Sequence, residues 1–235
     1  MVAIFKREIK SFFVTPIFYI FLTMFLFLSA FFFQISGIMR HGVADISLFF
    51  ELMPWTLMFL IPVLTMRSIA DERKSKTDQL LLTAPVKMWE IVLAKYFAAL
   101  CVFVIAILST LIFPAILFFL GNPGVATVIS HYLGYILYGA ALIAIGIFIS
   151  SLTENQFIAA VVTFGLLFML TFISMLGVWS GDIRIARAVN FVSLQNRFEY
   201  FNFGILDLSS IIYFILIAAL FIFLTVQRLD RKRVV

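Results

Sequence analysis

The stretch that decides the fold is 11-SFFVTPIFYIFLTMFLFLSAFFFQISGIM-39, in which no residue carries a charge. A helix that crosses a bilayer needs about 20 predominantly apolar residues, and this stretch is longer than that. A secretory signal has an apolar region of only roughly 7–15 residues, and no clear small-residue cleavage site is present here. The stretch therefore predicts an uncleaved first membrane span over residues 17–38.

The composition of the whole chain agrees with lipid as its main solvent. Hydrophobic residues make up 64% of the 235 residues and charged residues only 12%. A soluble domain with so little charge could not cover so much apolar surface. The net charge of +5 does not indicate a nucleic-acid partner, because the charges lie in short segments between apolar runs. We expect one all-α membrane domain over residues 1–235.

Five further apolar runs, separated by charged or turn-forming residues, predict five more spans. They cover residues 52–66, 96–120, 132–151, 157–176 and 208–226. Lys and Arg set the orientation, because they accumulate on the cytoplasmic side. With six spans, the start of the chain, residues 67–95 and the tail share one side and hold thirteen of them, against four on the other. This count predicts a multi-pass membrane protein with both termini in the cytoplasm.

The first 15 residues have the pattern of an amphipathic helix. Phe5 and Ile9 fall on an apolar stripe, whereas Lys6 and Lys10 fall on a basic one. Such a helix lies in the membrane interface, in contact with lipid. The alternative is a simple membrane anchor whose charges only follow the positive-inside rule.

Residues 67–95 form the most charged segment between two spans. Good helix formers from Asp71 to Leu82 predict a short helix that Pro85 ends, and a second helix begins near Lys87. Leu80 and Leu81 give the first helix a small apolar face, which suits docking into a groove of a partner. The alternative is a solvated charged loop.

Residues 177–207 are too apolar for a free loop, but their apolar runs are too short for a helix that crosses the membrane. Five aromatic residues between Phe191 and Phe203 predict interfacial or re-entrant helices on the outer side. An ordinary loop that carries the interfacial aromatic residues of a membrane protein is the alternative.

Two motifs make the chain similar to ABC-2 type permeases, the membrane subunits of type V ABC exporters. The first motif resembles the first cytoplasmic loop of that family and consists of Glu72-Arg73-Lys74, Thr77, Leu80-Leu81 and Thr83-Ala84-Pro85-Val86. The second, residues 150–156, resembles the junction of the fourth and fifth spans and is closest to the gliding-motility-associated branch. In the family the loop is a coupling helix that contacts an ATPase subunit. The residues to which the resemblance assigns this contact are Glu72, Arg73, Thr77, Leu80, Leu81, Pro85 and, as a second contact, Glu154.

The resemblance implies a chain that is not itself an enzyme. No Gly is followed by Lys, so the phosphate-binding motif of P-loop ATPases is absent from the sequence. ATP and Mg²⁺ would be bound by a cytoplasmic ABC ATPase subunit, and no catalytic, metal or cofactor site is expected on this chain. A second permease, identical or a sister subunit, would complete a dimeric exporter.

Two alternatives to export stay open. In one, the same parts transmit ATP-driven force to an envelope partner without transport. In the other, the chain is a stand-alone membrane enzyme or channel. The second alternative should show reactive side chains clustered at one depth or polar stripes along a pore, and neither pattern is seen in the sequence.

Overall fold

The computed structural model describes residues 1–36, 46–74, 87–121, 124–179, 189 and 193–233. This part of the chain contains helices and turns and no strand. Six helices in these described ranges are long and apolar enough to cross a membrane. The predicted all-α membrane fold with six spans is thereby confirmed. The six are α2 (Pro16–Ile35), α4 (Ser47–Thr65), α7 (Met88–Ser109), α9 (Val125–Ser150), α10 (Gln156–Trp179) and α13 (Leu208–Arg233).

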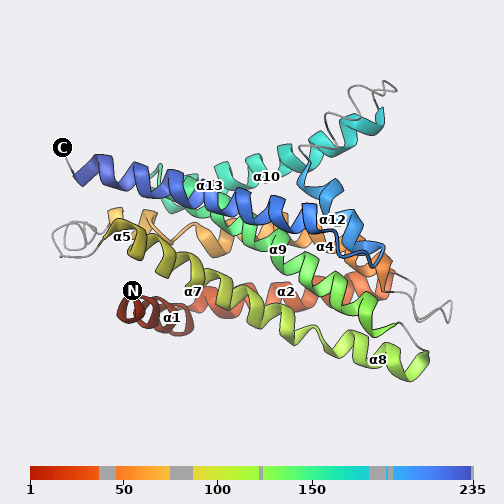
Figure 1. Cartoon of the computed structure of the whole chain (residues 1–235). Helices are drawn as coiled ribbons and strands as arrows, with labels where there is room; N and C mark the ends of the chain where they lie inside the picture. The colour runs from red at the N-terminus through yellow and green to blue at the C-terminus, as the bar shows by residue number, and fades with distance from the viewer. Residues whose placement is uncertain (37–45, 75–86, 122–123, 180–188, 190–192, 234–235) are drawn as a thin grey trace.

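Within the described residues, four shorter helices lie at the ends of this bundle: α1 (Val2–Val14), α5 (Ala70–Lys74), α8 (Ile112–Leu120) and α12 (Leu194–Asn202). Both chain termini, α1 and α5 lie at one end, and α8 and α12 lie at the other (Figure 1). We call the end formed by α1, α5 and the last turns of α13 the basic end. The arrangement agrees with an even number of spans.

Helix α9 is the centre of the bundle and contacts α4, α7, α10, α12 and α13. Of its most apolar stretch 78% is buried, against 22% for α10 and α13. Glycines let its neighbours approach closely. A methyl group at Gly139 would overlap the ring of Phe103 on α7, and one at Gly146 would overlap Thr65 on α4. The core therefore forms around one helix that has glycines where α7 and α4 pack against it.

The helix of the third predicted span begins near Lys87, as expected, but it is interrupted before residue 120. Helix α7 begins at Met88, within the charged segment, and ends at Ser109, where a turn separates it from α8. Pro114 explains this break, because it has no N–H to donate to the carbonyl of Thr110. That carbonyl instead accepts a hydrogen bond from the Tyr132 hydroxyl at 3.0 Å.

Two other helices begin earlier than predicted. Helix α9 starts at Val125 rather than at residue 132, and His131 is buried within it, with its Nδ1 2.6 Å from the carbonyl oxygen of Thr127. Helix α4 starts at Ser47 rather than at residue 52, and Glu51 lies exposed in its early turns. Polar residues that end an apolar run in the sequence thus lie inside the helices. Helix α4 also continues through Pro54 and Pro62.

The predicted outer segment, residues 177–207, is described in part. Its helix α12 is capped by Ser193, whose side chain accepts a hydrogen bond from the backbone N–H of Asn196. Phe198 and Phe201 are buried, and α12 packs on α9 and α4. Residues 180–188 and 190–192, with Phe191, lie outside the described part of the chain. The described portion is a helix packed on the bundle.

Candidate coupling site at the basic end

Helix α1 lies along α7 at the basic end, through the face that the sequence pattern predicts. Phe5 and Ile9 are half-buried, whereas Lys6 and Lys10 are exposed. The packed face also contains a residue that the pattern did not single out. Glu8 lies beside the apolar stripe and has a side chain only 14% exposed.

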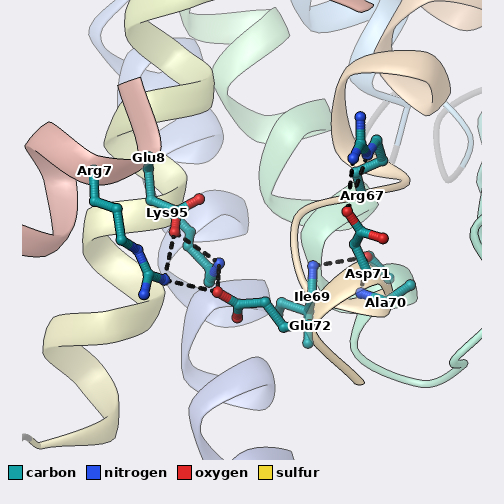
Figure 2. A network of polar contacts seen from close by, with 9 residues as sticks. Arg7, Glu8, Arg67, Ile69, Ala70, Asp71, Glu72 and Lys95 are labelled. Atoms are coloured by element: carbon teal, nitrogen blue, oxygen red, sulfur yellow. Dashed lines mark hydrogen bonds and ion pairs between the residues drawn. The ribbon is translucent and has the colours of Figure 1, made fainter. Parts of the chain in front are cut away.

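Glu8 belongs to a closed ring of four charged side chains from three helices (Figure 2). Arg7 Nη2 lies 3.0 Å from Glu8 Oε1 and 2.8 Å from Glu72 Oε1. Lys95 Nζ lies 3.1 Å from the same oxygen of Glu8 and 2.9 Å from that of Glu72. Each cation therefore touches both carboxylates, and the ring joins α1, α5 and α7.

The burial of Lys95 makes this ring more than a surface ion pair. Its side chain is only 3% exposed, on a helix that continues into the apolar bundle. An ammonium group in such a place keeps its charge only if carboxylates surround it. Arg7, in contrast, is 55% exposed, and its hydrogen bond to Glu8 raises the pKa of its guanidinium above the ordinary value. The ring has no net charge, and Lys95 supplies the positive charge in its buried part.

A second polar group holds the start of α5. Arg67 Nη2 donates to Asp71 Oδ2 at 2.8 Å, one helical turn along the chain. The other oxygen of Asp71 accepts a hydrogen bond from the side-chain amide of Gln156, the first residue of α10. The loop that follows α4 is therefore tied to α10 as well as to α1 and α7.

Ser150, at the end of α9, makes the closest link between α5 and the centre of the bundle. Its hydroxyl oxygen accepts hydrogen bonds from the backbone N–H groups of Ile69 and Ala70, both at 3.1 Å. The hydroxyl donates to the carbonyl of Met66 at 3.2 Å. These N–H groups would otherwise have no partner within the helix that starts there. A side chain from another span thus caps α5.

The structure brings together the two sequence motifs that resemble permeases. The stretch from Ser150 to Gln156 meets α5 through both of its terminal residues, and Glu154 lies exposed between them. Glu72 belongs to the ring, and the side chain of Arg73 is buried. The other predicted coupling residues, Thr77, Leu80, Leu81 and Pro85, lie outside the described part of the chain.

Sequence reasoning assigned no individual role to four residues of this site: Glu8, which it did not single out, and Lys95, Ser150 and Gln156, which it noted only as parts of motifs. The sequence nevertheless contains a signal for two of them, Glu8 and Lys95. Glu8 is the single acid in a basic helix, and Lys95 is the last charge before a long apolar run. A charge that lies so close to an apolar span is expected to have a partner. Among the described residues, no group of three or more His, Cys, Asp or Glu side chains could hold a metal ion.

Six spans, an amphipathic helix beside them and a polar junction that ties the ends of four spans together are the architecture of a multi-pass transport subunit. A family model described as ABC-2 family transporter protein matches residues 39–227. The chain belongs to this family and is a transmembrane permease subunit of an ABC transporter. Permeases of this family are typically non-catalytic and cooperate with an ATPase subunit. A comparison with curated proteins gives no match.

Proposed function

We propose that a separate cytoplasmic ABC ATPase binds at the basic end and drives the spans through α5 and the residues that follow it. The observation that carries the proposal is that α5 is bonded to α1, α7, α9 and α10 at once. A partner that moved α5 would therefore pull on three spans and on the interfacial helix together. A solvated loop between two spans would need none of these bonds.

The charge distribution supports the orientation in this proposal. The basic end contains α1, α5, the start of α7 and the last turns of α13, and lysine and arginine accumulate on the cytoplasmic side of a bilayer. We therefore place both termini in the cytoplasm. The resemblance of residues 150–156 to the gliding-motility-associated branch supports the bacterial cell membrane as the location of the protein. The opposite end, with α8 and α12, faces outward.

The ring suggests different roles for the residues that resemble a coupling helix. Glu72 is engaged by Arg7 and Lys95, so it orients α5 on the bundle. Leu80 and Leu81, farther along the segment, supply the apolar contact with the ATPase. Glu154, exposed beside α5, supplies the second contact.

The assembly and the direction of transport are part of the same proposal. We expect a dimer with an identical or sister permease, and export rather than import, with ATP and Mg²⁺ bound only by the ATPase. The stretch from Ser150 to Gln156 favours the gliding-motility-associated branch of the family.

The test is a detergent pull-down of the chain co-expressed with its genomic neighbours, with ATPase activity in the eluate as the readout. The variant replaces Leu80 and Leu81 by Asp, because two charged side chains cannot dock in an apolar groove. The matched control replaces Ile205 and Leu206 by Asp. Both control residues are exposed, lie at the opposite end and undergo the same change of charge.

We expect the wild type and the control to retain an ATPase, and the Leu80/Leu81 variant to lose it while still inserting into membranes. Equal ATPase activity in all three eluates would refute the assignment of the coupling segment. The absence of an ATPase from every eluate would refute the proposal that an ATPase is the partner and would favour a stand-alone membrane protein.

A further inference from the structure

A cavity of about 300 Å³ lies at the basic end, between α1, the start of α2, the end of α4, α5 and α7. Three cations and three carboxylates line it, together with apolar side chains. The charged residues are Arg7, Glu8, Arg67, Asp71, Glu72 and Lys95, all of which are labelled in Figure 2. Its volume falls within the range of small-ligand sites.

The position of the cavity favours a ligand that is part polar and part apolar. It lies where α1 ends at Val14 and α2 begins at Pro16, which is where the chain passes from the membrane surface into the bilayer. Phe12, Ile17 and Leu64 line it beside the charged groups. A phospholipid has this composition, with a charged headgroup at the interface and chains that continue into the apolar layer.

The charges of the lining favour a headgroup that is itself neutral overall. Two guanidinium groups face the cavity with hydrogen-bonding capacity remaining. Arg7 binds its carboxylates through Nη2, and Arg67 binds Asp71 through Nε and Nη2, so Nη1 of each makes no hydrogen bond to the described residues. Guanidinium groups are well suited to phosphate. The lining holds as many cations as carboxylates, so a headgroup that carries only negative charge would upset this balance, whereas a headgroup with both a phosphate and an ammonium group would keep it.

We infer that the cavity binds the headgroup of a zwitterionic phospholipid with a primary amine, such as a phosphoethanolamine lipid. The phosphate lies between Arg7 and Arg67, and the ammonium group lies toward the carboxylates. The acyl chains leave past Phe12 and Ile17. The site rests on the membrane placement of α1 and not on the ATPase, so it can fail or succeed independently of the proposed function.

The test is native mass spectrometry of the delipidated protein in detergent, titrated with dioleoyl phosphatidylethanolamine, phosphatidylcholine or phosphatidylglycerol, and separately with inorganic phosphate. We expect phosphatidylethanolamine to bind about tenfold more tightly than the other two lipids, since one charge-assisted hydrogen bond has about this effect. Phosphatidylcholine cannot donate such a bond, and phosphatidylglycerol has no cation.

Three variants locate the site. Replacing Arg7 and Arg67 by Gln should weaken binding of phosphatidylethanolamine about tenfold or more, because both phosphate ligands lose their charge. Ser11→Phe fills the cavity, retains every charge and should have the same effect if the headgroup enters it. The matched control is Lys10→Gln, which removes a charge from an exposed position of the same helix. It should leave the affinity unchanged.

Equal affinity for the three lipids would overturn the inference. So would a wild-type affinity in the Ser11→Phe variant, or inorganic phosphate that binds as tightly as the phospholipid. Each of these results would mean that lipid binds elsewhere or that the cavity recognises only an anion.

Discussion

Replacing Lys95 by Met tests whether the charged ring fixes α1 and α5 on the bundle. Methionine has a similar length and no charge, so it fills the space without the ammonium group. Glu8 and Glu72 would then face each other with Arg7 as their remaining partner in the ring. Both carboxylates are more than four-fifths buried, so water would screen their repulsion only in part.

The magnitude follows from the burial of the three groups. Removing one partner of a fully buried ion pair costs about 3–5 kcal/mol, whereas exposed pairs contribute about 0–1 kcal/mol. Lys95 is 3% exposed but its partners are 14% and 18% exposed, so the cost should fall somewhat below the buried range. We expect Lys95→Met to lower the free energy of unfolding by about 2–3 kcal/mol, roughly a 30- to 150-fold change in the equilibrium constant.

The assay is an equilibrium unfolding titration in mixed micelles, run as a double-mutant cycle with Glu8→Gln. In the wild type, Glu8→Gln should destabilise, because it removes a partner of Lys95. In the Lys95→Met background it should stabilise by about 1 kcal/mol, because it removes the repulsion that the first change leaves. Lys10→Met, at an exposed position of α1, should stay within about 0.5 kcal/mol of the wild type.

Two results would refute the reasoning. One is a cost of Lys95→Met no larger than that of Lys10→Met. The other is an effect of Glu8→Gln that has the same sign and size in both backgrounds, which would mean that the two side chains act independently.

Three further changes test other parts of the structure by the same titration. Ser150→Ala should cost about 1–3 kcal/mol, because it leaves two buried backbone N–H groups at the start of α5 without their acceptor, and faster hydrogen exchange at those amides would confirm the cause. Gly139→Ala should cost about 1–3 kcal/mol by forcing apart α7 and α9, whereas Gly165→Ala, where a methyl group meets nothing within 4 Å, should be tolerated; equal effects would contradict the close packing. Asp207→Ala should cost about 1 kcal/mol at pH 7, because Asp207 accepts hydrogen bonds from the first turn of α13. The hydrogen bond from the Ser210 hydroxyl lowers the pKa of Asp207 below its ordinary value, so this stabilisation is complete above about pH 4 and is lost as the pH falls through the lowered pKa. A cost of Asp207→Ala that persists undiminished at pH 3 would refute that role.

The six spans could be predicted from the sequence because a span depends mainly on local composition. An apolar run such as that which ends at Met39 can be assigned to the membrane without knowing which other segments pack against it. The amphipathic α1 and the start of α7 near Lys87 follow from equally local patterns, and both are found in the structure.

The helix boundaries that the sequence did not predict depend on hydrogen bonds, either to residues far along the chain or within the helix itself. The break after Ser109 is stabilised by Tyr132, 22 residues away from the carbonyl that it binds. The early start of α9 is possible because His131 bonds to its own helix. Neither hydrogen bond can be predicted from the hydropathy of the sequence.

The candidate site could be predicted only in part for the same reason. The two motifs were identified separately, but their meeting at Ser150 joins residues 80 or more positions apart. The ion pair between Glu8 and Lys95 joins residues 87 positions apart. A single sequence contains both charges and no information about which of them are neighbours.

The cap that Ser150 places on α5 gives α9 the properties of a lever. A helix of 26 residues is about 39 Å long, which exceeds the hydrocarbon thickness of a bilayer of about 30 Å. A tilt of about 5° at the capped end would displace the far end by about 3 Å, where α9 packs against α12. Because α9 is one continuous helix from Val125 to Ser150, such a tilt would displace its far end at the opposite membrane surface.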